Sequence, residues 1–334
     1  MKRIKIVSVV SLLIVIALLL PLTSCMNSIE KIQYAIISEN NISDDGLIYN
    51  IYENKTAVIT GAQSESEELV IPDEVDGYAV VEIGENAFSG KEMLLLVTIG
   101  KNVTMIGANA FSECPYLARV QVGEALTEIC DSAFYNCVKL TELIGAKKIR
   151  TIEVNAFFGC SSLAYFDMPE TLTTIGDEAF SGCSALTKIS IPSSVKTVGE
   201  GAFSYCSSLV DVSLGEISEI SRMMFHNCGS LDTITLPSTV KVVKSHAFRL
   251  CEKLTKIGLP KSVNMIEDSA FAQCDSLSTV LYEGSESDFE KIKFVLSKTD
   301  KDDPYDDSAE AMSQSKASND PLIAATFEYK QKLK

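Results

Sequence analysis

The most constraining feature of the sequence is a motif that recurs about every 23 residues. Nine phenylalanines stand 23 residues apart, except for one interval of 22. Ile or Val lies five residues before each of them, and Leu lies six residues after. A unit of this length cannot close a core of its own, so the sequence predicts repeats that stack and bury their apolar columns against one another. The nine phenylalanines are Phe88, Phe111, Phe134, Phe157, Phe180, Phe203, Phe225, Phe248 and Phe271.

Two periodicities coexist within one repeat. Ala179, Cys183 and Leu186 have the spacing of one buried face of a short helix, whereas Ile189 and Ile191 alternate with polar residues as in a strand. One short helix or 3₁₀ turn and one short strand per repeat is the plan of a leucine-rich repeat, whose period is about 20–29 residues. We therefore predict a repeat solenoid with a parallel β-sheet on its concave face and short helical or 3₁₀ turns on the other face.

The repeat signature Ala-Phe-x-x-Cys-x-x-Leu resembles that of the BspA-type leucine-rich repeat proteins of bacterial surfaces, and the resemblance covers residues 83–282. Residues 46–82 are similar to the hairpin-like N-terminal cap of such proteins. Residues 283–334 resemble their C-terminal cap, with Phe289 at a position where tryptophan is more usual. The resemblance implies a surface protein that binds other proteins, with adhesion to host or neighbouring-cell ligands as the best-known role.

The sequence departs from the regular repeat in four places. Lys91 replaces the first cysteine of its column, which fits a terminal repeat that is open to water. Cys130 stands where glycine is usual, so that turn is expected to be altered. One repeat lacks a residue and has Gly215-Glu216 where Ile-Pro would continue, which predicts a kink or a tightened turn. Residues 297–320 form an acidic insert whose composition predicts a disordered, solvated loop.

The first 24 residues read as a secretory signal, with basic residues followed by an apolar run that is short for a permanent anchor. Leu-Thr-Ser-Cys at its end resembles the bacterial lipobox, and the resemblance implies lipidation of Cys25. Simple secretion and an uncleaved helix are the alternatives. The prediction is an exported protein, displayed at the surface of the cell envelope, that is held to the membrane by lipid at Cys25 and a tether over residues 25–45.

The cysteines follow the repeat. Their spacing is not that of a zinc site, and a buried thiol of suitable size is the favoured interpretation. Disulfides between stacked neighbours are the alternative, since export makes them chemically possible. The column consists of Cys114, Cys137, Cys160, Cys183, Cys206, Cys228, Cys251 and Cys274.

The remaining composition argues against several functions. A formal charge of −16 disfavours nucleic acid as a partner. The two histidines, His226 and His246, could form a metal pair or part of a dyad, but surface or half-buried positions are favoured. Acidic pairs in the insert could hold calcium, but they lack the EF-hand spacing. We expect no enzyme activity, no cofactor and no metal, and the sequence does not indicate an oligomeric state.

What remains as a candidate site is the solvent-facing side of the predicted sheet. Its middle mixes apolar, aromatic and charged groups, which suits a protein ligand, although a face that is simply hydrated is the alternative. Two other functions stay open: a lipoprotein that organises the envelope without an external ligand, and a carbohydrate-binding accessory lipoprotein. The candidate residues are Arg119, Gln121, Glu142, Ile144, Tyr165, Asp167, Lys188, Asp211, Thr233, Thr235 and Lys256.

Overall fold

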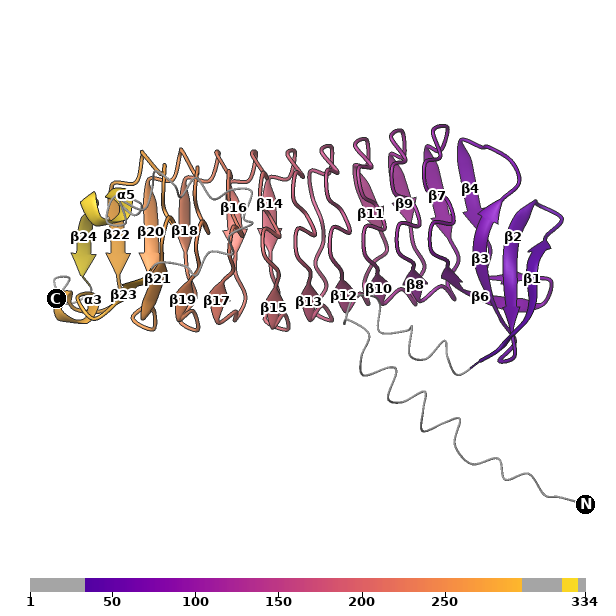
Figure 1. Ribbon diagram of the computed structural model, residues 1–334, viewed down its shortest axis with the longest axis horizontal. Helices are drawn as coiled ribbons and strands as arrows, with labels where there is room; N and C mark the ends of the chain where they lie inside the picture. Colours follow the sequence, from indigo (N-terminus) through magenta and orange to yellow (C-terminus); the bar gives the residue numbers. More distant parts are fainter. Residues whose placement is uncertain (1–33, 296–319, 330–334) are drawn as a thin grey trace, which may run out of the picture.

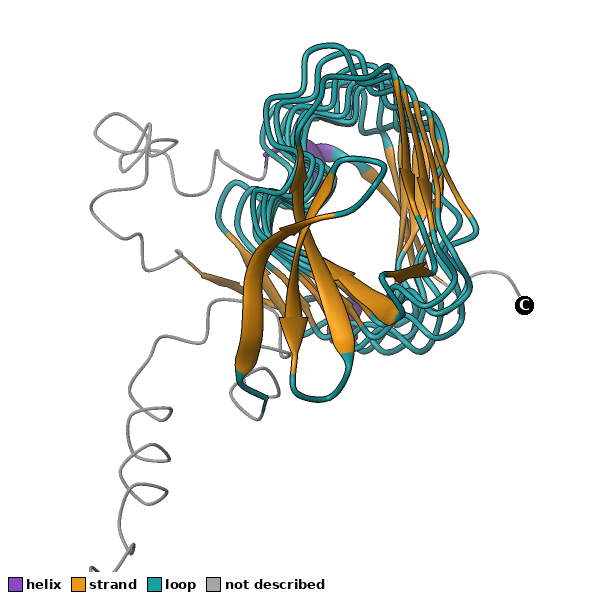
Figure 2. Cartoon of the chain, turned by 90° about the vertical axis from the view of Figure 1, so that its right-hand side faces the viewer, coloured by secondary structure: helices purple, strands orange, loops and turns teal. Residues whose placement is uncertain are grey.

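The structure, a computed structural model, describes residues 34–295 and 320–329. In Figure 1 the chain winds into a long stack of similar turns, and Figure 2, which looks along the stack, shows that successive loops superimpose. The predicted leucine-rich repeat solenoid is confirmed. The predicted signal segment, Cys25 and residues 297–319 of the insert lie outside the described residues. No helix among the described residues is long and apolar enough to cross a membrane.

An antiparallel sheet covers the N-terminal end of the stack. Its strands are β1 (Ile36–Ile42), β2 (Leu47–Tyr52) and β3 (Thr56–Ala62), and β3 runs parallel to β6 (Tyr78–Ile83), which also pairs with β5 (Glu74–Val75). Because β1 lies inside the segment that we predicted as a tether, ordered structure begins about ten residues earlier than expected. Irregular alternation across the bulges of the β1–β2 pair hid this strand from the sequence pattern.

One row of strands corresponds to the predicted sheet, and we call it the long-strand row. Its strands run in parallel, so that Lys188 lies opposite Asp211 and Thr233 opposite Lys256 in neighbouring turns. The row is composed of β4 (Glu68–Ile71), β7 (Leu96–Ile99), β9 (Arg119–Gln121), β11 (Glu142–Ile144), β14 (Lys188–Ser190), β16 (Asp211–Ser213), β18 (Thr233–Thr235), β20 (Lys256–Leu259), β22 (Thr279–Tyr282) and β24 (Thr326–Tyr329).

Each repeat also contributes to a second row, which the sequence analysis did not predict. Here the Ile or Val that precedes each phenylalanine by five residues ends a very short parallel strand. Segments this short show no alternation in the sequence, which is why they escaped prediction. After β6, this short-strand row consists of β8 (Met105–Ile106), β10 (Glu128–Ile129), β12 (Thr151–Ile152), β13 (Thr174–Ile175), β15 (Thr197–Val198), β17 (Glu219–Ile220), β19 (Val242–Val243), β21 (Met265–Glu267) and β23 (Lys293–Val295).

The segment around each phenylalanine is a chain of tight turns, not the short helix or 3₁₀ turn that we predicted. The residues two positions before and two positions after each of the nine phenylalanines have positive φ, as at Glu178 (52°) and Gly182 (73°). These two residues and the phenylalanine between them donate their N–H groups to the next repeat, as in the bond from Phe180 to the Ala202 carbonyl (2.9 Å). A left-handed residue at these positions interrupts a helix, because only consecutive right-handed residues can continue one.

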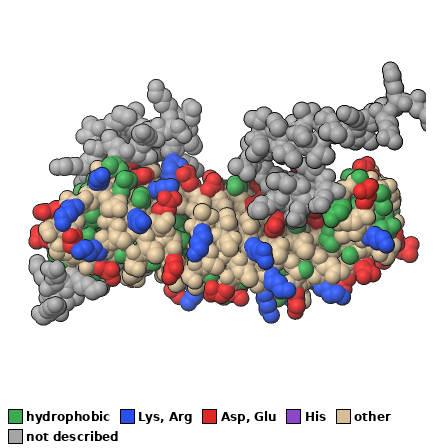
Figure 3. All heavy atoms as spheres, turned by 90° about the horizontal axis from the view of Figure 1, so that it is seen from below, with side chains coloured by type: hydrophobic (Ala, Val, Ile, Leu, Met, Phe, Trp, Pro, Cys, Tyr) green, Lys and Arg blue, Asp and Glu red, His purple; other side chains and the backbone are tan. Residues whose placement is uncertain are grey.

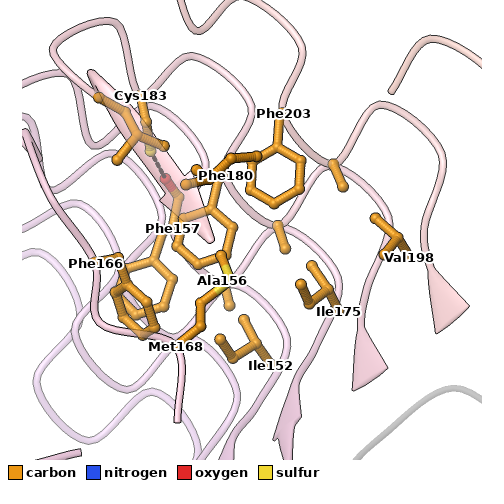
Figure 4. Close-up of a cluster of buried hydrophobic side chains, with 14 of the residues drawn as sticks. Ile152, Ala156, Phe157, Phe166, Met168, Ile175, Phe180, Cys183, Val198 and Phe203 are labelled. Carbon is orange, nitrogen blue, oxygen red and sulfur yellow. Dashed lines mark hydrogen bonds between the residues drawn. The ribbon is translucent and has the colours of Figure 1, made fainter. Parts of the chain in front are cut away.

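The core is a continuous stack of phenylalanine rings, whose centroids are 5.2 to 6.0 Å apart along the nine repeats. Figure 4 shows Phe157, Phe180 and Phe203 in line, with the Ile and Val column of the short-strand row beside them. Every phenylalanine of the stack is 2% exposed or less. Burial of this column between neighbours is the main stabilising interaction of the solenoid, because no repeat can bury its own ring.

The C-terminal end is closed by α3 (Glu286–Phe289), α5 (Asp320–Ala324) and the last strand of each row. Ser285 and Asp288 form a capping box at the start of α3. Phe289, which stands in the position of the expected tryptophan, packs against Phe327 at a centroid distance of 4.4 Å and edge-on to Tyr282 at 5.5 Å. An aromatic ring thus covers the last apolar layer.

The predicted change at Cys130 is absent from the backbone. Its N–H donates to the Ile106 carbonyl at 3.0 Å, as the N–H of Glu153 does to Ile129 in the next repeat (2.9 Å). The Cys130 side chain is buried against Met105 and Ala108, outside the main core. The Cys130 side chain thus packs beside Ala108 at a position where four other repeats have glycine and four have larger residues.

Candidate interaction surface

The long-strand row places all the candidate residues on one side of the solenoid, and we call this side the long-strand face. Every candidate side chain is exposed or half-buried there, whereas the residues that alternate with them point into the core. Arg119, Glu142, Tyr165, Lys188 and Asp211 follow one another at intervals of one repeat. The predicted alternation is thus confirmed, while binding at this face stays a prediction.

Two ion pairs lie along the face. The Arg119 Nη2 to Glu142 Oε1 distance is 3.0 Å, and the Lys188 Nζ to Asp211 Oδ2 distance is 2.7 Å. The Asp211 carboxylate raises the pKa of the Lys188 ammonium group through this contact. Exposed pairs of this kind contribute only about 0–1 kcal/mol to stability, so they are available to reorganise around a partner.

Tyr165 lies between these two pairs and is 57% exposed. Its hydroxyl donates a long hydrogen bond to Asp167 (3.4 Å). The segment that carries it, residues 164–168, is not a strand, so the long-strand row is interrupted here. An exposed aromatic side chain with charged groups on both sides is the composition typical of an interface anchor.

The interruption has a local cause in the core. Phe166 occupies the position that Ile189 holds one repeat later, and its ring fits edge-on between Phe157 (5.2 Å) and Phe180 (5.1 Å), as Figure 4 shows. In the preceding repeat, Gly145 directly follows β11 and turns the chain sharply, with a φ of +96°. The sharp turn at Gly145 and the larger ring of Phe166 in the next repeat together displace residues 164–168 from the strand ladder. The sequence analysis predicted neither feature.

The irregularity expected at the shortened repeat is present as a groove. It has a volume of about 380 Å³ and lies between residues 210–214 and residues 233–237. Asp211, Thr233 and Thr235, three of the candidate residues, line it. The signal in the sequence was the residue that this repeat lacks. From it we predicted a kink or a tightened turn, but not a groove.

The eight column cysteines are free and buried, which confirms the favoured interpretation. Each thiol donates to the carbonyl of the phenylalanine in the preceding repeat, as Cys183 does to Phe157 at 3.3 Å. Burial raises the pKa of the Cys228 thiol to about 12 and that of Cys206 well above its ordinary value, so these thiols stay protonated and act as donors. Lys91, which has no such carbonyl to reach, pairs with Glu65 at 2.6 Å instead.

The histidines are more buried than predicted, with exposures of 3% for His226 and 9% for His246. The Tyr205 ring packs edge-on against His226 at 5.2 Å, which explains the burial. Burial, together with the charges of Arg249, His246 and Arg222, lowers the pKa of His226 to about 4. Among the described residues, no group of three or more His, Cys, Asp or Glu side chains could hold a metal ion.

The side of the solenoid that lies below in Figure 1 carries the short-strand row. Figure 3 shows acidic and basic side chains interspersed along it, without a large area of one charge. Its strand residues belong to the short-strand row, among them the exposed Thr197. This side provides matched control positions for tests of the long-strand face.

Two stacked strand rows joined by turns, with an alternating exposed face, define a leucine-rich repeat scaffold of the kind that generally mediates protein interaction. The family profile described as BspA type Leucine rich repeat region, in six copies, matches residues 81–210 and 173–299. The chain therefore belongs to the BspA-type leucine-rich repeat family. Repeats of this family are generally interaction scaffolds and not catalysts.

Several solved structures are similar to this chain. A leucine-rich repeat protein from Bacteroides ovatus has 24% identity and a TM-score of 0.58, over 77% of this chain and 68% of that one. A leucine rich cell surface protein from Faecalibacterium prausnitzii has 24% identity and a TM-score of 0.42, over 77% of this chain and 98% of that one. The leucine-rich repeat protein of T. pallidum has 28% identity and a TM-score of 0.42, over 72% and 91%. Among curated proteins, none matches the sequence.

Proposed function

We propose that this protein is displayed on the bacterial cell surface, held by lipid at Cys25, and binds a protein ligand through the long-strand face. Adhesion to a host or a neighbouring cell is the corresponding biological role. The observation that carries the proposal is Tyr165, which is 57% exposed on the long-strand face where the row is interrupted, between two ion pairs. An exposed aromatic side chain with charged groups on both sides suits the centre of an interface.

The binding test is a pull-down of partners by the lipid-free protein and its variants. Tyr165→Ala should lower recovery of a bound protein about 30-fold, because loss of an interface anchor typically costs 2 kcal/mol or more. Arg119→Glu should also weaken binding, since it places two acidic groups side by side at Glu142. Tyr116→Ala is the matched control, because Tyr116 is 56% exposed but lies on the corner before β9. Equal recovery with all four proteins would refute binding at this face.

Display is tested on intact cells. External protease should remove an outward-facing protein, and a Cys25→Ala variant should appear in the medium or remain unprocessed. Full protection from the protease would favour an envelope-organising lipoprotein without an external ligand. Recovery of glycans in place of proteins in the pull-down would favour a carbohydrate-binding accessory role.

A further inference from the structure

The solenoid has one place, among the described residues, where both strand rows break between the same two repeats. No ladder joins β16 to β18 in the long-strand row, and none joins β15 to β17 in the short-strand row. The turns around the phenylalanines stay connected there, with bonds from Phe203 N–H to Met224 C=O (3.1 Å) and from Tyr205 N–H to His226 C=O (2.7 Å). The Ser221 hydroxyl, directly after β17, also donates to the Val198 carbonyl at the end of β15. The two repeats are therefore attached at the turns and at this bond, and open between β16 and β18.

The missing residue explains this opening. Four positions separate Ile191 from Val195 at a regular corner, but three separate Leu214 from Ile217 at this one. The shorter corner draws β16 out of register with β18. The Phe203 and Phe225 rings are correspondingly the most widely spaced of the stack, at 6.0 Å.

The open edges carry backbone groups with no partner in the described chain. Asp211 N–H bonds to Thr187 C=O (3.2 Å) and Ser213 C=O accepts from Ile191 N–H (2.8 Å), so both residues face β14. Since successive residues of a strand direct their N–H and C=O groups to opposite sides, Val212 presents both of its groups to the groove.

The opposite edge follows the same rule. Leu236 N–H bonds to Gly258 C=O at 2.9 Å on the β20 side. Alternation therefore directs the N–H and C=O groups of Thr233 and Thr235 into the groove. The groove thus has donors and acceptors on both walls, in the alternation that a parallel strand can pair with.

The side chains of the groove suit a strand as well. Val212 and Leu214 are half-buried, whereas the equivalent Ile189 and Ile191 in the preceding repeat are 1% and 3% exposed. Small hydroxyl side chains, those of Ser213, Thr233 and Thr235, surround the opening. A pleated segment would match this arrangement if its aliphatic side chain pointed toward Val212 and Leu214 and its small polar side chains pointed toward the hydroxyl groups at the opening.

We propose that this groove, which we call the strand slot, binds an extended peptide segment of a partner protein by adding it as a strand between β16 and β18. This inference rests on the proposed function, because the strand slot opens on the long-strand face, and it names the partner chemistry. The bound segment is uncharged, about three residues long within the slot, and alternates β-branched and small polar residues. Main-chain bonds to both edges hold it, and the aliphatic side chain covers Val212 and Leu214.

The test uses the lipid-free protein and a fluorescently labelled peptide with the sequence of residues 186–192, which include β14, carrying Lys188→Thr so that the segment is uncharged. Binding should saturate by roughly millimolar peptide, since a short strand forms few bonds. A peptide N-methylated at the residues corresponding to Ile189 and Ser190 should bind at least tenfold more weakly, because it lacks two donors. Absence of saturable binding, or equal binding of both peptides, overturns the proposal.

Two variants locate the binding. Insertion of one serine between Gly215 and Glu216 restores the regular corner, closes the slot and should abolish peptide binding; the same insertion in the exposed turn between Glu53 and Asn54 is the control. Thr235→Pro removes a donor that faces the slot and leaves the β18–β20 ladder intact, so it should weaken binding several-fold. Unchanged binding in both variants overturns the proposal, whether or not either one alone affects folding.

The remaining outcomes separate the two proposals. Peptide binding that survives Tyr165→Ala, with no partner recovered in the pull-down, would support the strand slot and refute the wider face. Partner binding that depends on Tyr165 but persists in the insertion variant would support the long-strand face and refute the strand slot. A concentration-dependent dimer of the wild-type protein that the insertion abolishes would identify a second copy as the occupant and overturn the proposed partner.

Discussion

Eight of the nine repeats contain a buried thiol that performs two roles at once. The Cys183 side chain fills a fully buried position, and its Sγ donates to the Phe157 carbonyl of the preceding repeat. The same bond recurs for all eight column cysteines, at 3.0 to 3.3 Å. Cysteine is favoured because it combines a small apolar volume with a weak donor.

Substitution of Cys183 separates these roles. Cys183→Ala should lower the free energy of unfolding by about 2 kcal/mol, since it leaves a small void and removes one of the two hydrogen bonds to the Phe157 carbonyl, the other coming from Cys160 N–H. Cys183→Ser keeps a donor and should cost about 1 kcal/mol less than the alanine variant. Urea denaturation of the three proteins measures the difference. A serine variant that is no more stable than the alanine variant would show that packing alone selects the thiol.

His226 should make stability dependent on pH. Its pKa falls from an ordinary 6.5 to about 4 in the folded protein, so folding favours the neutral ring. The stabilisation is complete above the unfolded-state pKa and is lost as the pH falls through 6.5 toward 4. Relative to the neutral His226→Gln variant, the wild-type protein should lose stability over this range in urea titrations at several pH values. A difference that stays constant from pH 7 to pH 4 would contradict this account.

At the scale of the element, the turn around each phenylalanine is where sequence reasoning failed. Ala179, Cys183 and Leu186 do lie on one buried side, as the helical spacing predicted, but turns of alternating handedness produce the same spacing. The available signal was the frequency of Asn and Gly two residues from phenylalanine, as at Asn155 and Gly159, because these residues tolerate positive φ. The strand after the turn was predicted correctly except at residues 164–168, since alternation is direct there in the other repeats.

One turn carries a residue that fits its backbone poorly. Leu250 has a φ of +63°, at a position where five of the other eight repeats have Gly or Asn. Leu250→Gly should raise the free energy of unfolding by about 1 kcal/mol relative to Leu250→Ala, because both lose the same side chain but only alanine keeps the Cβ. Thermal or urea unfolding of the pair measures this. Equal stability would mean that the left-handed backbone is not strained by a Cβ.

At the scale of the whole molecule, the scaffold could be predicted from the sequence, whereas the candidate binding site could be predicted only in part. Stacking requires the same residue in every repeat, so the phenylalanine, cysteine and leucine columns predicted the core directly. The face around Tyr165 consists of positions that vary from repeat to repeat, and its interruption at Phe166 depends on packing against two neighbouring rings. Such three-dimensional exceptions leave no periodic signal.

The central claim, that the long-strand face is the binding surface, is tested most directly by site-specific photo-crosslinking on intact cells. A photoreactive side chain at Asp167, beside Tyr165, is compared with one at Thr197, an exposed strand position of the other row. We predict one crosslinked protein partner from position 167, none from 197, and loss of the product when Tyr165→Ala is added. Equal products from both positions, or a product from position 167 that survives Tyr165→Ala, would contradict the claim.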